Sequence, residues 1–108
     1  YHNFTMTPSH AELRSIVNKC RDAGGEIVKV ACQVFNPEDV ANIMSLYRIE
    51  KNIIAFGMGL EGLISRIAAP LLGAEFTYAS ADKDNTTAQG QITVKEMKAF
   101  YRILSYEN

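Results

Sequence analysis

Apolar residues recur along this chain with two alternating periods. Short apolar runs rich in strand-forming residues occupy residues 27–32, 52–58 and 75–80. Apolar residues spaced three and four positions apart, as on one face of a helix, fill residues 8–23, 36–47, 63–70 and 93–104. Strands that alternate with helices in this way predict βαβ units, and therefore an α/β fold with a parallel sheet.

Capping residues mark the ends of the first two helices. Thr7 can cap the first helix and Pro8 fits its first position, while glycines at 24–25 would end it. Asn36 and Pro37 open the second helix in the same manner. The predicted apolar faces are Leu13, Ile16, Val17 and Cys20 in the first helix, and Val40, Ile43, Met44 and Tyr47 in the second.

The two later helices carry signals of their own. Pro70 should disturb or end the third helix, because proline lacks the N–H that the helix interior needs. Thr93 and Glu96 have the spacing of a capping box at the start of the last helix. The apolar residues are Leu63, Ile64, Ile67 and Ala68 in the third helix and Met97, Phe100, Tyr101 and Leu104, expected inward, in the last.

The number of units fits half of a closed barrel. The opening residues YHNF read as the end of one more strand, which gives four βα units repeating at roughly 25 residues. A closed eight-unit barrel takes about 250 residues. The sheet could be open or belong to a barrel. In a barrel, the 108 residues present would be a (βα)4 half of a TIM-type (βα)8 barrel, with parallel strands and helices on the outer face.

Composition narrows the classes of partner. The chain is 47% hydrophobic and 21% charged with a formal net charge of -1, which is typical of one globular domain. It contains neither a basic cluster for nucleic acid or an anionic membrane nor an apolar stretch of about 20 residues. We expect a cytoplasmic protein with neither partner, in which Cys20 and Cys32 are small core residues without a chemical role.

Lys29 is an unexpected residue for an apolar strand. Side-chain alternation places it on one face with Ile27 and Ala31. The opposite face consists of Val28, Val30 and Cys32. If helices cover that second face, Lys29 points into the barrel. The alternative is a lysine on an edge strand with its amine in solvent.

Other polar or soft side chains follow the predicted strands, where TIM-type barrels assemble their sites. These are His2, Met58, Arg66, Thr87 and Gln91. Each has a plainer explanation: a surface histidine, a solvated arginine and turn glycines at 57 and 59 need no site. On pattern alone, the sequence indicates an α/β domain that could carry a lysine-centred site.

Four segments taken together are more specific. The segments Y-H-N-F, I-V-K-V-A, M-G-L-E-G-L-I-S-R and T-T-A-Q-G-Q-I occur in this order. In order and spacing, including the interval between His2 and Lys29, they closely resemble the carboxyl-terminal half of the type I 3-dehydroquinate dehydratases, enzymes of the shikimate pathway of aromatic amino acid biosynthesis. The resemblance covers residues 1–108 and implies a carboxyl-terminal half-barrel.

The resemblance also implies roles for matching residues in a hydro-lyase that converts 3-dehydroquinate to 3-dehydroshikimate and water. Lys29 would form an imine with the substrate ketone, and His2 would move the proton next to the imine carbon. Arg66 would bind the substrate carboxylate, with Gln91 and Thr87 closing over it from a loop. The walls would be formed by Phe4, Met58 and Tyr78. The family requires neither a metal nor an organic cofactor.

The residue types suit that chemistry on physical grounds. Imine formation needs a neutral amine, and burial or a neighbouring cation disfavours the ammonium form of a lysine. The protonated imine then stabilises the charge left when the adjacent proton departs. Histidine titrates near the operating pH, so one ring can accept and return a proton. A planar guanidinium meets both oxygens of a carboxylate.

The chain departs from the family pattern at three points. Its loop reads T-A-Q-G-Q where S-A-P-G-Q is typical, so a stiffening proline is missing and we expect looser loop closure. Gly57 replaces a common serine, which we expect to matter little. The amino-terminal half, whose glutamate orients the histidine and whose acidic and arginine residues bind substrate, is absent from the sequence.

Three functional interpretations follow. The chain could be the catalytic half of a dehydratase, or a truncated half-barrel with little or no turnover that acts as a structural or vestigial protein. A different imine-forming barrel, such as a class I aldolase, is chemically possible but unsupported by Arg66 and the loop. Because a half-barrel exposes two sheet edges and an inner face, we predict a homodimer or pairing with an amino-terminal half-barrel.

Overall fold

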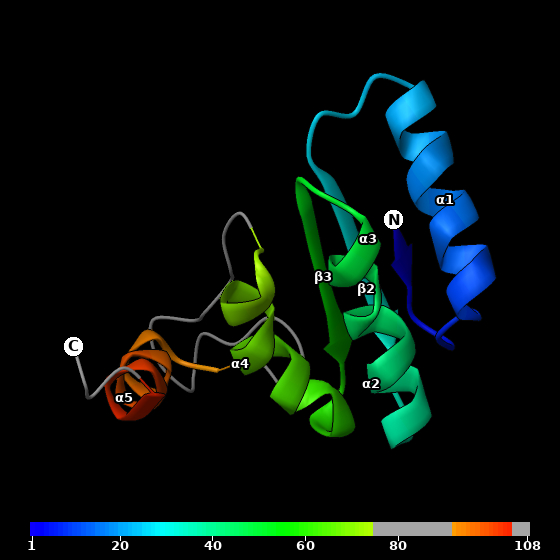
Figure 1. Cartoon of the computed structure of the whole chain (residues 1–108). Coiled ribbons are helices and arrows are strands. Elements are labelled where there is room, and N and C mark those ends of the chain that lie inside the picture. The colour runs from blue at the N-terminus through cyan, green and yellow to red at the C-terminus, as the bar shows by residue number, and fades with distance from the viewer. Residues whose placement is uncertain (75–91, 105–108) are drawn as a thin grey trace.

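The computed structural model describes residues 1–74 and 92–104, in which strands and helices alternate (Figure 1). The predicted strand at 75–80 and the loop after it lie outside the described residues. The elements, in order, are β1 (His2–Asn3), α1 (His10–Asp22), β2 (Val28–Gln33), α2 (Pro37–Met44), α3 (Leu46–Ile49), β3 (Ile53–Met58), the 3-10 helix η1 (Leu60–Gly62), α4 (Leu63–Leu72) and α5 (Val94–Leu104).

The described strands form one parallel sheet in the order β1-β2-β3. His2 lies opposite Ala31, which in turn lies opposite Phe56, so these three residues form one layer across the sheet. Lys29 lies opposite Ile54 in the layer below. The parallel α/β arrangement predicted from the sequence is confirmed for these three strands.

The outer face of the sheet is covered by α1, α2 and α3, which lie together on one side of β2 and β3 (Figure 1). This face holds the main core, because every second strand residue points at the helices. Its fully buried members are Leu13, Val17, Val28, Val30, Cys32, Val34, Ile43, Leu46, Ile53 and Ala55. Cys32 is thus a core residue, as predicted, and the face assignment of β2 is confirmed.

The inner face has a separate, smaller cluster. It consists of Ala31, Ile54, Phe56 and Met58. Ile27, predicted to be buried on this face, is instead 48% exposed, because β2 begins one residue later. The prediction for Ile27 was therefore wrong, although Lys29 and Ala31 do share the inner side of the strand.

Two of the predicted helix starts are confirmed and one is wrong. Asn36 caps α2 by accepting from the Asp39 N–H at 2.9 Å, and proline occupies its first turn. The first helix is capped by Ser9 rather than Thr7, since the Ser9 hydroxyl accepts from the Glu12 N–H at 3.2 Å. Thr7 is buried and donates to the Gln33 carbonyl at 2.7 Å, which ties the loop before α1 to the end of β2.

The buried faces of α4 and α5 differ from those that the spacing of apolar residues predicted. Pro70 lies inside α4, in its last turn, and the helix continues to Leu72. The residues that α4 buries are Ser65, Arg66 and Ala69, while Leu63 and Ile64 are exposed. In α5 the predicted capping box between Thr93 and Glu96 is present and Met97 is buried, but Phe100 and Leu104 are exposed. No helix within residues 1–74 or 92–104 combines the length and apolarity needed to cross a membrane.

Candidate active site

Lys29 is the second residue of β2, which lies between β1 and β3, so the edge-strand explanation of this lysine is wrong. Its side chain is half-buried on the inner face, and its Nζ lies 5.7 Å from the centroid of the Phe56 ring. Lys29 belongs to the first half of β2, so its side chain leaves the strand below the carboxyl-terminal rim of the sheet. That rim is formed by Gln33 and Met58. Ala31 follows two residues later on the same face, one layer closer to the carboxyl-terminal rim.

Arg66 is a buried cation, and the interpretation of it as a solvated surface charge is wrong. The residue is 4% exposed, and its guanidinium carbon lies 4.4 Å from the centroid of the Phe56 ring. Burial lowers the pKa of the guanidinium, although arginine stays protonated in proteins. Its Nε is buried and has no hydrogen-bond partner among the described residues. An unsatisfied N–H on a buried cation is costly, and an anion placed beside it would remove that cost.

The neighbouring Ser65 positions Arg66. Its buried hydroxyl accepts from the Gly57 N–H at 2.7 Å and donates to the Gly62 carbonyl at 2.5 Å, so it ties the start of α4 to β3. The backbones of Gly57 and Gly62 touch, because a Cβ on Gly62 would lie 2.6 Å from the Gly57 carbonyl carbon. Gly57 is thus a residue of close packing inside β3, rather than the turn glycine that the sequence suggested.

His2 lies at the edge of the same region. Burial, and then the positive charge of Lys29, lower the pKa of His2 below its ordinary value of 6.5. The ring is therefore neutral at pH 7 and able to accept a proton. The Phe4 ring stands edge-on to it with centroids 5.7 Å apart, and Phe4 is 71% exposed.

The remaining predicted site residues divide into two groups. Met58 belongs to the inner-face cluster beside Phe56 and is buried. The others, Thr87, Gln91 and Tyr78, lie outside the described residues. The sequence analysis did not name Phe56, which lies beside both Lys29 and Arg66. The alternation through β3 places it on the same face as Ile54 and Met58 and so signals its position.

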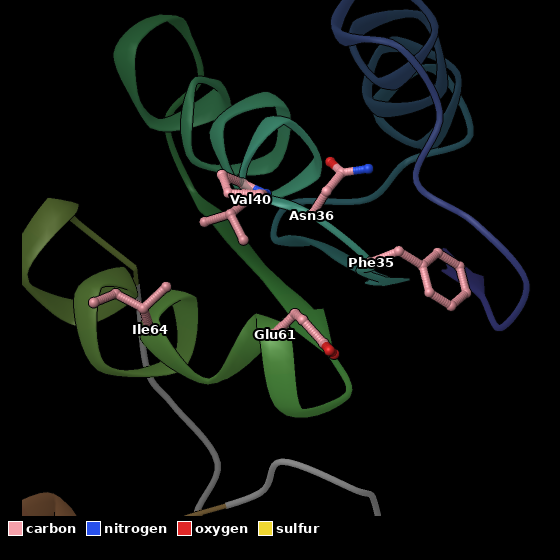
Figure 2. A pocket seen from close by; sticks show the side chains of 6 residues that line it. Phe35, Asn36, Val40, Glu61 and Ile64 are labelled. Carbon is pink, nitrogen blue, oxygen red and sulfur yellow. The ribbon is translucent and has the colours of Figure 1, made fainter.

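Two surface hollows lie elsewhere on the described part of the molecule. One, of about 310 Å³, lies between the start of α2 and the segment η1–α4, where Val40 and Ile64 face the opening and Glu61 borders it (Figure 2). The other, of about 450 Å³, is lined by residues of α1, α2 and α3, including His10, Arg14 and Arg48. Neither hollow includes Lys29, His2 or Arg66. Within the described residues, no group of three or more histidine, cysteine, aspartate or glutamate side chains could hold a metal ion.

The fold and the inner-face residues define a class of protein: a parallel βα-barrel unit with a lysine, a histidine and a buried arginine gathered on the inner face of its sheet. The family model described as Type I 3-dehydroquinase matches residues 1–108. The chain belongs to the type I 3-dehydroquinase family.

Individual relatives agree with this assignment. A 3-dehydroquinate dehydratase of Dehalococcoides mccartyi is 39% identical over 110 residues, which cover all of this chain and 50% of the relative. One from Pyrococcus abyssi is 36% identical over 104 residues, covering 96% of this chain and 47% of the relative. The chain thus spans about half the length of the curated relatives it matches.

Solved structures show the same half-length correspondence. A 3-dehydroquinate dehydratase of Geobacillus kaustophilus superposes with a TM-score of 0.87 at 30% identity, covering 98% of this chain and 42% of that one. A type I 3-dehydroquinate dehydratase of Clostridium difficile, solved with covalently modified comenic acid, gives a TM-score of 0.83 at 26% identity and covers 100% and 44%. The prediction of a TIM-type half-barrel is confirmed.

Proposed function

We propose that this chain is the carboxyl-terminal, imine-forming half of a 3-dehydroquinate dehydratase, acting in the cytoplasm on the shikimate pathway. The observation that carries the proposal is the convergence of Lys29 and the buried Arg66 on one ring of the inner face. A ketone and a carboxylate on one small molecule need an amine and a guanidinium held in such proximity. Family membership and the names of the relatives support this choice of substrate.

The first half of the proposed reaction activates the substrate. The unprotonated amine of Lys29 attacks the ketone, and the carbinolamine takes up a proton from solvent and loses water, which gives a protonated imine. Neutral His2 then takes a proton from the carbon next to the imine carbon. The electron pair left behind moves into the protonated imine, which becomes an enamine.

The second half expels water. The enamine pushes its electrons back, the hydroxyl on the next carbon departs, and His2 returns its proton so that the hydroxyl leaves as water. Water then hydrolyses the conjugated protonated imine, which releases 3-dehydroshikimate, returns the proton to solvent and restores the amine of Lys29. One water is consumed for the one released on imine formation, so the net loss is one water.

Arg66 is proposed to bind the substrate carboxylate. It is a buried cation with an unsatisfied N–H, and a carboxylate supplies the missing acceptor with a charge-assisted hydrogen bond. Met58 and Phe4 are proposed as walls of the site, together with Tyr78. Thr87 and Gln91 remain predicted to close over the carboxylate.

Borohydride trapping tests this proposal. The chain is incubated with 3-dehydroquinate and borohydride, the adduct is located by peptide mass spectrometry, and the enone absorbance of the product is followed in parallel. An adduct at Lys29 with turnover supports the catalytic assignment. Absence of an adduct contradicts it, and adducts formed only with aldol substrates would indicate an aldolase instead.

A second candidate is that residues 1–108 by themselves keep the amine but turn over little or not at all. The observation that favours it is that the chain spans about half of its relatives. An adduct at Lys29 without turnover is the result that distinguishes it from the catalytic assignment.

We further propose that the open sheet is covered in solution, either by a second copy of the chain or by an amino-terminal half-barrel. The two-residue strand β1 is hydrogen-bonded to β2 on one side, and Phe4 and Met6 beyond it are exposed. Exposed strand edges and apolar rims favour association. Light scattering on the isolated chain should give a dimer or larger species, and a monomer would exclude self-association.

A further inference from the structure

Phe56 contacts both cations of the inner face. Its ring lies 4.4 Å from the guanidinium carbon of Arg66 and 5.7 Å from the Nζ of Lys29. The ring itself is buried among Ala31, Ile54 and Met58, so its place is fixed by packing within the sheet. One buried side chain therefore lies against cationic groups from two different elements, β2 and α4.

The physical role of the ring follows from the burial of Arg66. A buried guanidinium loses its hydration, and an aromatic face returns part of that loss through the cation–π attraction. A guanidinium held over a ring keeps its N–H groups at its edge, where they can bind both oxygens of a carboxylate. An aliphatic side chain of similar size would fill the space without attracting the cation.

We propose that Phe56 is a positioning residue, whose ring holds the Arg66 guanidinium at the place where it binds the carboxylate of a keto acid while the ketone reaches Lys29. The proposal rests on the proposed function and adds a residue to it. It predicts that loss of the ring weakens recognition of the carboxylate more than it changes the reactivity of the amine toward a simple ketone.

The test compares two probes, 3-oxocyclohexanecarboxylate and cyclohexanone, by their rates of borohydride trapping at Lys29. The unmodified chain should prefer the keto acid. Phe56→Leu should lower the ratio of the keto-acid rate to the cyclohexanone rate about tenfold. Phe56→Tyr keeps an aromatic face and should restore the preference, whereas Arg66→Met should abolish it. Equal slowing of both probes in Phe56→Leu would show a merely structural role and overturn the proposal.

A second readout keeps the outcome decisive if no imine forms. Titration of 3-oxocyclohexanecarboxylate into isotope-labelled protein is followed at the Arg66 Nε–H signal by NMR. The ring should shift this signal upfield in the free protein, and Phe56→Leu should remove the shift and weaken binding about tenfold. Carboxylate binding that depends on Phe56, without any adduct at Lys29, would refute the proposed function but support the role of the ring. Binding unchanged in Phe56→Leu would overturn the role of the ring. Phe56→Tyr serves as the folded comparison if Phe56→Leu is unstable.

Discussion

The two faces of the sheet differ in the kind of side chain that they bury. The outer face, under α1, α2 and α3, is apolar throughout and its core members are almost fully buried. The inner face has a cluster of only four apolar residues, and it places a half-buried lysine and a buried, incompletely hydrogen-bonded arginine beside them. Outer-face residues stabilise the fold, whereas the inner face keeps charges at a cost in stability that a bound anion would offset.

The largest stability effect is expected on the outer face. Ile43→Ala removes a fully buried side chain and should lower the free energy of unfolding by about 3 kcal/mol, because a cavity remains among packed helices. Ile64→Ala is the matched control, since Ile64 is 63% exposed, and it should cost less than about 1 kcal/mol. Urea denaturation measures both. Similar losses in the two variants would contradict the assignment of the main core to the outer face.

On the inner face, Ala31→Leu should act on chemistry instead. Ala31 lies between His2 and Phe56 in the layer above Lys29, so a larger side chain there would take up volume between the amine and the carboxyl-terminal rim. We expect trapping of 3-dehydroquinate at Lys29 to fall about 100-fold, the cost of displacing a reactant by about 1 Å. Peptide mass spectrometry measures the rate. Unchanged trapping would mean that the substrate does not enter between these residues.

Arg66→Met should raise stability while it removes carboxylate recognition. The replacement fills a similar volume without a buried charge, and we expect a gain of about 1 kcal/mol in the free energy of unfolding. Arg14→Met, at an exposed arginine, should change stability by less than about 0.5 kcal/mol. Thermal and urea unfolding test both variants. A clear loss of stability in Arg66→Met would show that contacts within the fold already offset the cost of burying the guanidinium.

Lys29→Met should raise the pKa of His2, because one of the causes that lower it is the lysine charge. A histidine whose folded pKa is lowered binds fewer protons in the folded state, so stability should fall as the pH drops through 6.5 toward the folded pKa. The substitution should weaken that pH dependence. NMR titration of the His2 ring follows the pKa directly, and an unchanged titration would place Lys29 too far away to influence it.

The smallest effect concerns the cysteines. Burial raises the pKa of Cys32 to about 11, so its thiol is protonated at neutral pH and hidden in the outer core. Cys20 is less buried. Iodoacetamide at pH 8 should therefore modify Cys20 first, as followed by peptide mass spectrometry. Faster modification of Cys32 would show that the outer face opens readily.

The periodicity of apolar residues was enough to predict that strands and helices alternate along the chain. The in-and-out alternation of side chains within β2 was enough to predict which face of the sheet carries Lys29. Helix details depended on tertiary contacts. Thr7 and Ser9 can both cap a helix. Ser9 is the cap of α1, because the Thr7 hydroxyl donates instead to the Gln33 carbonyl. Apolar spacing predicted the wrong buried face for α4. The Ser65 hydroxyl accepts a hydrogen bond from the Gly57 N–H of β3, so Ser65 and Arg66 are buried and Ile64 is exposed.

The site was predicted in part. His2, Lys29 and Arg66 were named from short segments of sequence, but spacing alone treated Arg66 as a solvated charge. Its burial arises from the contact of Gly57 with Gly62, which brings the start of α4 against β3. Phe56 was missed because an aromatic residue in an apolar run looks like core until the cations beside it are located.

The central claim is that the amine of Lys29 condenses with a keto acid on the inner face. The most direct measurement is a quantitative peptide map after borohydride reduction in the presence of 3-dehydroquinate. The structure predicts a single reduced adduct at Lys29 that diminishes in Arg66→Met. Equal modification of exposed lysines such as Lys19 and Lys51, or none at Lys29, would contradict the claim.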